Sequence, residues 1–218
     1  MEIVVDPRFN GPPASANGGY TCGLVAGLLG ARAAEVTLRR PPPLGLPLRW
    51  DGEVLWDGDL VVAEGRAAEL DLDVLPPPSW VQVERARPGF VGFREHAFPT
   101  CFVCGPERAE GDGLRIFAAR IDGFVAATWT PADPAAEFAW ASLDCPGAYA
   151  LEWTGRSDML LGRLHGRLDR VPEPGECCLV VGWPLEWDGR KGYAGTALWS
   201  ADRGDLLACA RATWICPK

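Results

Sequence analysis

Closely spaced glycines are the feature that most constrains how this chain folds. They follow a polar loop that ends at Asn17, and they stand mostly three or four residues apart, at Gly19, Gly23, Gly27 and Gly30. On a helix this spacing gives one smooth face, so another element must pack very close to it. A helix with so little side-chain bulk is stable only when other structure surrounds it. We therefore predict a buried helix here, with a tightly curved sheet against its glycine face.

The entrance to this helix also carries polar groups. Asn17 suits an N-cap, because its side-chain oxygen can accept a hydrogen bond from a free N–H of the first turn. Gly18 and Gly19 leave backbone N–H groups unobstructed, and the positive end of the helix dipole favours a negative oxygen nearby. An ordinary cap on a tightly packed core helix explains the same residues, so both interpretations stay open.

Composition excludes several classes of partner. The chain has 218 residues, 48% of them hydrophobic, which suffices for one sizeable domain or two small ones. It has no apolar run near the length of about 18 residues that a membrane span needs. The net charge of −8 argues against nucleic acid or an anionic membrane surface as a partner. With no secretory pattern in MEIVVDPRF, and with Ala, Arg and Trp abundant, we expect a cytoplasmic bacterial protein.

The cysteines allow two interpretations. The chain has eight, scattered, with Cys177 and Cys178 adjacent, so we expect reduced thiols. Cys101 and Cys104 have the spacing of a zinc-binding pair, with His96 nearby and Cys145 as a further ligand if the fold brings it close. The usual second pair is missing, and a thiol-lined turn is the alternative. We assign no metal ligands and no cofactor.

The chain repeats one arrangement, a helix followed by a strand meander. Residues 39–45 are echoed by 169–175, and residues 55–63 by 198–208, which indicates an internal duplication. The second helix is predicted over Phe138–Trp153, where Pro146 either lies in the first turn of a helix that begins near Cys145 or kinks a longer one. A helix with an antiparallel meander is typical of an α+β fold, in which a sheet wraps round one helix.

Between the halves the sequence indicates less order. The segment from Pro76 to about Pro99 begins with three prolines and is predicted to be a linker. A strand is predicted over Leu114–Arg120, before an Asp122-Gly123 turn.

Three motifs carry a family resemblance. They are Asn17-Gly18-Gly19-Tyr20, Arg39-Arg40-Pro41, and Cys101-Phe102-Val103-Cys104-Gly105 followed by Gly113-Leu114-Arg115-Ile116-Phe117. With the duplication, the chain resembles the hotdog-fold acyl-CoA thioesterase superfamily in its fused double-hotdog form. The resemblance implies two antiparallel sheets, each wrapped round a central helix, that form a pseudo-dimer. It divides the chain into an N-terminal hotdog over 1–92 and a C-terminal hotdog over 93–218.

The resemblance also implies hydrolysis of an acyl thioester. A backbone N–H at the helix entrance would polarise the thioester carbonyl, and a carboxylate from the other half would act as general base or nucleophile. Asp144 is the first choice for that carboxylate, with Glu152 in reserve. Asn17 would orient the water or the carbonyl, with the Gly19 N–H as oxyanion donor. Relatives often carry His before the glycine pair, where this chain has Asn17, so no general base stands there.

Alternatives remain for these residues. Asp144 suits the N-cap of a helix, because a proline follows it two residues on. Cys145 lacks an evident activating base and is interpreted as a small core residue.

Binding residues follow from the same resemblance. Gly18 and Tyr20 belong to the helix entrance. Arginines at the groove mouth could bind the phosphates of coenzyme A, or serve only for solubility: Arg39, Arg40, Arg163 and Arg167. Aromatic residues could line an acyl or aryl pocket, or simply pack the core: Trp129, Phe138, Trp140, Tyr149 and Trp153.

Three functions stay in view. The first is a thioesterase that acts on a small-molecule acyl thioester, with coenzyme A as part of the substrate and neither nucleic acid nor membrane as a partner. The second is an acyl-CoA-binding protein without catalysis. A hotdog hydratase or dehydratase ranks last, because His165 sits on a predicted strand without a matching motif. A monomer and a homodimer are both compatible with fused halves.

Overall fold

A computed structural model describes residues 1–151 and 159–216. Its helices are α1 (Gly18–Leu29), α2 (Trp80–Ala86), α3 (Ala136–Ser142) and α4 (Cys145–Ala150), with short 3-10 helices at Pro7–Phe9, Arg87–Gly89 and Val91–Phe93. None of the helices in these two ranges is long and apolar enough to cross a membrane.

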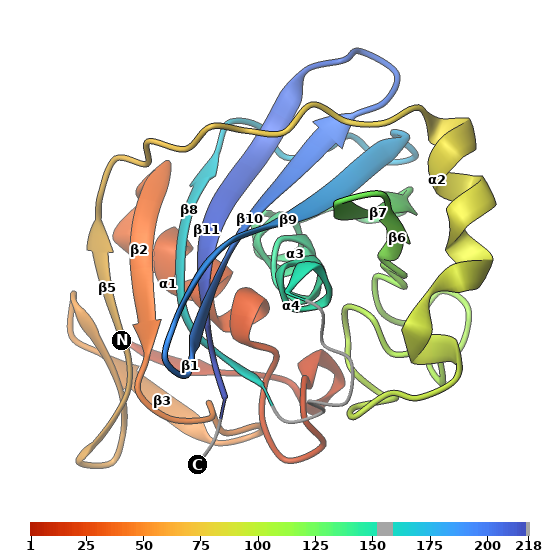
Figure 1. Ribbon diagram of the computed structural model, residues 1–218. Coiled ribbons are helices and arrows are strands. Elements are labelled where there is room, and N and C mark those ends of the chain that lie inside the picture. The colour runs from red at the N-terminus through yellow and green to blue at the C-terminus, as the bar shows by residue number, and fades with distance from the viewer. Residues whose placement is uncertain (152–158, 217–218) are drawn as a thin grey trace.

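Eleven strands of the described chain form one antiparallel sheet that curves round α1, α3 and α4 (Figure 1). Their order across the sheet is β1-β3-β4-β5-β2-β8-β11-β10-β9-β7-β6. The strands are β1 (Glu2–Val4), β2 (Ala33–Leu38), β3 (Pro47–Trp50), β4 (Val54–Asp57), β5 (Leu60–Ala67), β6 (Ala119–Ile121), β7 (Phe124–Trp129), β8 (Leu160–Leu168), β9 (Cys178–Asp188), β10 (Lys191–Ser200) and β11 (Leu206–Ile215).

The strand order confirms the internal duplication. Counted outward from the centre, β2, β5, β4, β3 and β1 match β8, β11, β10, β9 and β7, and β6 extends the second edge. The echoed segments 39–45 and 169–175 follow the matching strands β2 and β8. These two strands pair antiparallel, with Val36 opposite Leu164, so the halves share one continuous sheet instead of having two separate ones. The division at residues 92 and 93 stays a prediction.

The glycine face of α1 packs against a helix, and the expectation that the sheet covers it was wrong. A Cβ on Gly19 would lie 2.6 Å from the Asp144 Cβ, and a Cβ on Gly23 would lie 2.8 Å from the Glu137 Cα. The sheet uses its own glycines for close approach, because a Cβ on Gly166 would lie 2.7 Å from the Trp140 ring. Missing side chains therefore set the depth at which the two central helices meet.

The second central helix is interrupted. In place of one helix over Phe138–Trp153, α3 ends at Ser142 and α4 begins at Cys145, which confirms the alternative that put Pro146 in a first turn. Proline fits there because its missing N–H would have no helical partner. The break leaves Asp144 between the two helices, where it is buried.

The segment between the halves is more ordered than predicted. Within the expected linker, Ser79 and Gln82 form a capping box that begins α2, a signal the sequence carries. The expected strand over Leu114–Arg120 is present only from Ala119, because Arg115 has a φ of 55°, which a strand does not accommodate. In Figure 1 the chain crosses from β5 over the sheet to α2. Its apolar residues pack on a second core that includes Leu179 and Val181 of β9.

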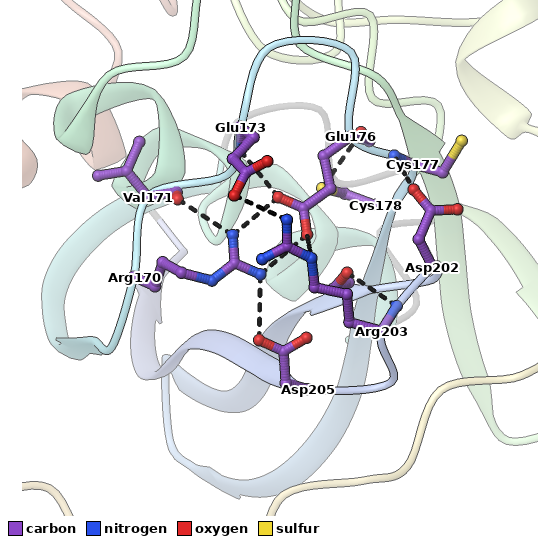
Figure 2. Close-up of polar contacts among 10 residues, drawn as sticks. Arg170, Val171, Glu173, Glu176, Cys177, Cys178, Asp202, Arg203 and Asp205 are labelled. Atoms are coloured by element: carbon purple, nitrogen blue, oxygen red, sulfur yellow. Dashed lines mark hydrogen bonds and ion pairs between the residues drawn. The ribbon is translucent and has the colours of Figure 1, made fainter.

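A partly buried network of ion pairs holds the loop after β8 against the turn between β10 and β11 (Figure 2). Arg170 donates to both carboxylate oxygens of Glu176 at 2.8 Å, and to Asp205 at 3.0 Å. The Glu173 N–H also donates to Glu176, whose side chain is only 4% exposed. The hydrogen bonds from Arg170 hold the pKa of Glu176 well below its ordinary value. The carboxylate is therefore charged, buried and dependent on its arginine.

The glycine contact predicts opposite effects for two neighbouring substitutions. Gly23→Ala should lower the free energy of unfolding by about 1–3 kcal/mol, because the new methyl group meets α3. A Cβ on Gly27 would have open space, since its nearest neighbour would be the Glu137 Oε1 at 4.0 Å. Gly27→Ala should raise the free energy of unfolding by up to about 1 kcal/mol through helix propensity. Urea unfolding of both variants tests this, and equal effects would contradict the packing described.

The ion pair predicts a second stability difference. Arg170→Ala should lower the free energy of unfolding by about 2 kcal/mol, because it removes both 2.8 Å hydrogen bonds to the buried Glu176 carboxylate and leaves the Arg203 Nε, 3.9 Å away, as its charged partner. The matched control is Arg211→Ala, which breaks an exposed 2.7 Å pair with Glu186 and should cost less than about 1 kcal/mol. Chemical unfolding at pH 7 measures both, and a control that costs as much as Arg170→Ala would argue against the buried pair.

Candidate functional site

A cavity of about 310 Å³ lies where the entrance of α1 meets the ends of β2, β8 and β11. Both halves of the chain contribute to its wall. The lining residues that matter below are Asn17, Gly18, Arg39, Arg40, Cys101, Cys104, Asp144, Cys145, Met159, Leu161 and Trp214.

The carboxylate of Asp144 is held by the entrance of α1. Its Oδ2 accepts hydrogen bonds from Asn17 Nδ2 at 2.7 Å and from the Gly19 N–H at 2.9 Å. The Asn17 Oδ1 accepts from the Tyr20 N–H at 2.9 Å, so Asn17 caps α1 and grips Asp144 at once. The second half thus supplies an acid to the helix of the first half.

The alternative role for Asp144, the N-cap of a helix, is confirmed in position but not in hydrogen bonding. Asp144 does occupy the N-cap position of α4, yet its side chain makes no capping hydrogen bond there. The Oδ1 atom is buried and has no hydrogen-bond partner among the described residues. One carboxylate oxygen is therefore held by α1, and the other can accept a hydrogen bond or a proton from a bound molecule.

Burial sets the proton affinity of this acid. Removal from water raises the pKa of Asp144 from 3.8 to about 7, because the charged form loses its hydration. The Gly19 N–H and the Asn17 amide act in the opposite direction by stabilising the carboxylate. Asp144 consequently exchanges a proton near neutral pH, as a general base requires.

The expected oxyanion donor is already in use, because the Gly19 N–H donates to Asp144. The neighbouring Gly18 lines the cavity, and its N–H has no acceptor within the described part of the chain. A Cβ on Gly18 would lie 2.9 Å from the Leu161 Cδ2, so a larger residue would crowd the space between the α1 entrance and Leu161. Gly18 therefore replaces Gly19 as the candidate donor to a substrate oxygen.

The structure brings together three thiols that the sequence separates. The sulfurs of Cys101, Cys104 and Cys145 lie within 4.8 Å of one another, so the fold meets the condition under which Cys145 could be a further ligand. All eight cysteines are free thiols. His96 stands apart from the sulfurs, because its Nδ1 accepts from the Phe98 N–H at 3.0 Å and its Nε2 lies 3.1 Å from the Cys104 carbonyl oxygen.

The arginines predicted to bind phosphate divide into two pairs. Arg39 and Arg40 line the cavity as expected. Arg163 and Arg167 do not, which corrects that placement: Arg163 lies 3.4 Å from Glu35, and Arg167 lies 3.0 Å from Asp169. Because they are four positions apart on β8, Arg163 and Arg167 share one face of the sheet, and neither lines the cavity.

Of the predicted aromatic residues, Trp140 and Tyr149 are buried and do not line this cavity, and Trp129 and Phe138 line a separate pocket. Trp140 is buried between Gly23 and Gly166, and Tyr149 is buried beside His96. Tyr20 stacks on Phe9 with ring centroids 4.2 Å apart.

The apolar wall comes from residues that sequence reasoning missed, namely Met159, Leu161 and Trp214. No local signal distinguishes these from other strand residues. Glu152 and Trp153 lie outside the described residues. The His165 Nε2 lies 3.3 Å from the Ala68 carbonyl oxygen and is not among the cavity residues.

No protein-family model and no curated protein matches the sequence. Solved structures match the fold over its full length. A hot dog fold protein of unknown function from Alicyclobacillus acidocaldarius has a TM-score of 0.66 at 14% identity, and covers 100% of this chain and 92% of its own. The tesB protein of Mycobacterium avium subspecies paratuberculosis has a TM-score of 0.64 at 10% identity, with the same coverage.

A third match is the acyl-CoA thioesterase II TesB2 from Mycobacterium marinum. Its TM-score is 0.56 at 12% identity, and the match covers 93% of this chain and 91% of that one. These similarities confirm the predicted α+β double-hotdog fold. At such identities they establish the architecture alone.

The pKa of Asp144 predicts how stability changes with pH. Because the folded state holds this proton more tightly than the unfolded state, the stability that protonation provides is lost as pH rises from about 4 to about 7. Relative to Asp144→Asn, which does not titrate, the wild type should lose about 1.4 kcal/mol of unfolding free energy per pH unit in that window. Urea unfolding of both proteins at pH 4.5, 5.5 and 6.5 (roughly even steps across the window) tests this. A constant difference between the two would show that Asp144 titrates normally.

Proposed function

We propose that this protein hydrolyses acyl thioesters of coenzyme A or of an acyl carrier protein. The observation that carries the proposal is the Asp144 carboxylate, buried on a cavity wall and held at the entrance of α1 with one oxygen unpartnered among the described residues. The structure from Mycobacterium marinum, which has the same fold, bears the name acyl-CoA thioesterase II, which agrees with this chemistry.

The geometry suggests a water-based mechanism. The thioester carbonyl oxygen would accept a hydrogen bond from the Gly18 N–H at the positive end of the α1 dipole. A water between Asp144 and the carbonyl carbon would donate its proton to Oδ1 as its oxygen attacks. The tetrahedral intermediate then expels the thiolate, which takes up the proton that Asp144 received. Asn17 and Gly19 hold the carboxylate in place throughout.

The cavity wall fits the two ends of such a substrate. Arg39 and Arg40 directly follow β2 on the cavity wall, and their guanidinium groups could pair with phosphate oxygens. Arg39 is also paired with Glu64 at 2.5 Å, and binding of phosphate would compete with that exposed pair. Apolar residues such as Leu161 and Trp214 supply a surface for the acyl group.

A second candidate function is binding of acyl-CoA without turnover. It is favoured by the hydrogen bonds of Asp144, since the Gly19 N–H and the Asn17 amide are both engaged before any substrate arrives. The two candidates differ in whether free coenzyme A is released.

Activity should depend on Asp144 and on pH. We expect Asp144→Asn to lower kcat by about 10²–10⁴-fold, because general-base catalysis is lost. In the wild type, kcat/KM should fall about tenfold per pH unit below the pKa near 7, since only the charged carboxylate accepts a proton. Chromatographic release of coenzyme A from short, medium, long and aryl thioesters measures both effects.

Asp59→Asn is the matched control, because Asp59 is exposed in the turn between β4 and β5 and should leave turnover unchanged. Full activity of Asp144→Asn would refute the assigned mechanism. If the wild type turns over no thioester but acyl-CoA raises its thermal midpoint, the binding function replaces the enzymatic one.

A further inference from the structure

Cys101, Cys104 and Cys145 form a compact cluster that the hydrolytic mechanism does not use. We propose that these three thiolates bind one Zn²⁺ ion, with a water from the cavity as the fourth ligand. This site departs from the expectation of no metal drawn from the sequence, which showed only one cysteine pair. It rests on the cluster geometry and is independent of the proposed hydrolysis.

The spacing of the sulfurs suits a tetrahedral ion. Zinc–sulfur bonds of about 2.3 Å at tetrahedral angles place two sulfurs about 3.8 Å apart. The Sγ atoms of Cys101 and Cys145 are 3.8 Å apart, and all three sulfurs lie within 4.8 Å of one another. A disulfide would need about 2.05 Å between sulfurs, and all three residues are free thiols.

The loop that carries two of the sulfurs is built to converge them. The Gly105 N–H donates to the Cys101 carbonyl oxygen at 2.9 Å, which closes a tight turn over Cys101–Cys104. A Cβ on Gly105 would lie 2.6 Å from the backbone N and O of Cys101 and from the Pro99 carbonyl oxygen. Only glycine therefore allows this turn, and the turn directs Cys101 and Cys104 to the same point.

Two side-chain donors point at sulfurs of the cluster. Asn17 Nδ2 lies 3.9 Å from the Cys101 Sγ, and the Tyr149 hydroxyl lies 3.9 Å from the Cys104 Sγ, each as a donor. Donors that point at buried sulfur are the outer contacts expected round metal-bound thiolates.

The fourth position opens on the cavity. Among the described residues, no other His, Cys, Asp or Glu joins the three cysteines within the same reach. The ring nitrogens of His96 are directed to the Phe98 N–H, the Cys104 carbonyl oxygen and the Tyr149 hydroxyl. All three cysteines line the cavity. Three protein ligands with one open position are typical of zinc sites that hold a water.

Direct metal binding tests the site without any activity assay. The 218-residue protein is stripped of metal with a chelator under reductant. Alkylation and mass spectrometry of one sample count its eight free thiols, and Co²⁺ is added to a second sample that has not been alkylated. We expect one equivalent to bind and to give the intense near-ultraviolet absorption of thiolate-to-cobalt charge transfer. One equivalent of Zn²⁺ should then abolish that absorption by displacement.

Variants locate the ion. Cys101→Ser, Cys104→Ser and Cys145→Ser should each remove the charge-transfer absorption, whereas Cys177→Ser, which alters a half-buried thiol outside the cluster, should keep it. Circular dichroism confirms that each variant is folded, and the wild-type titration stands without them. The proposal is overturned if the fully reduced wild type binds neither ion, or if Cys177→Ser removes the signal and the cluster variants keep it. A disulfide within the cluster that persists under reductant would overturn it as well.

Discussion

The contact between Gly19 and Asp144 is the one on which the rest of this molecule depends. A side chain at Gly19 would occupy the space of the Asp144 Cβ, so α1 and the α3–α4 junction meet only because that side chain is missing. The same approach lets the Gly19 N–H reach the carboxylate. The packing of α1 against the α3–α4 junction and the hydrogen bond to Asp144 therefore depend on the same close contact at Gly19.

The site belongs to neither half alone. Asn17 and Gly18 come from the first half, Asp144 and the three clustered cysteines come from the second, and the β2–β8 pair joins the two. The duplicated halves differ in their central helices, since α1 is continuous whereas the helix of the second half is divided into α3 and α4 at Asp144. A repeated architecture thus holds an asymmetric set of chemical groups.

Burial of Asp144 lowers stability and also raises the pKa of its carboxyl group. A carboxylate without water is costly, and the hydrogen bonds from Asn17 and Gly19 offset only part of that cost, which leaves a pKa of about 7. Asn17 also donates towards the Cys101 sulfur, so one amide connects the acid to the thiol cluster. The ion pair of Arg170 and Glu176 lies away from the cavity, in the loop after β8.

The sequence by itself determined the local features: the α1 glycine face, the Asn17 cap and the repeat. These follow from spacing and residue type, which act over a few positions. Only the tertiary structure decided which groups that are distant in the sequence come into contact. It placed α3, not the sheet, against the glycines, gave the Gly19 N–H to Asp144, and separated Arg163 and Arg167 from the cavity. It also brought Cys145 to Cys101 across 44 positions of the chain. Such contacts depend on how two helices and a shared sheet pack, and no short stretch of sequence encodes that packing.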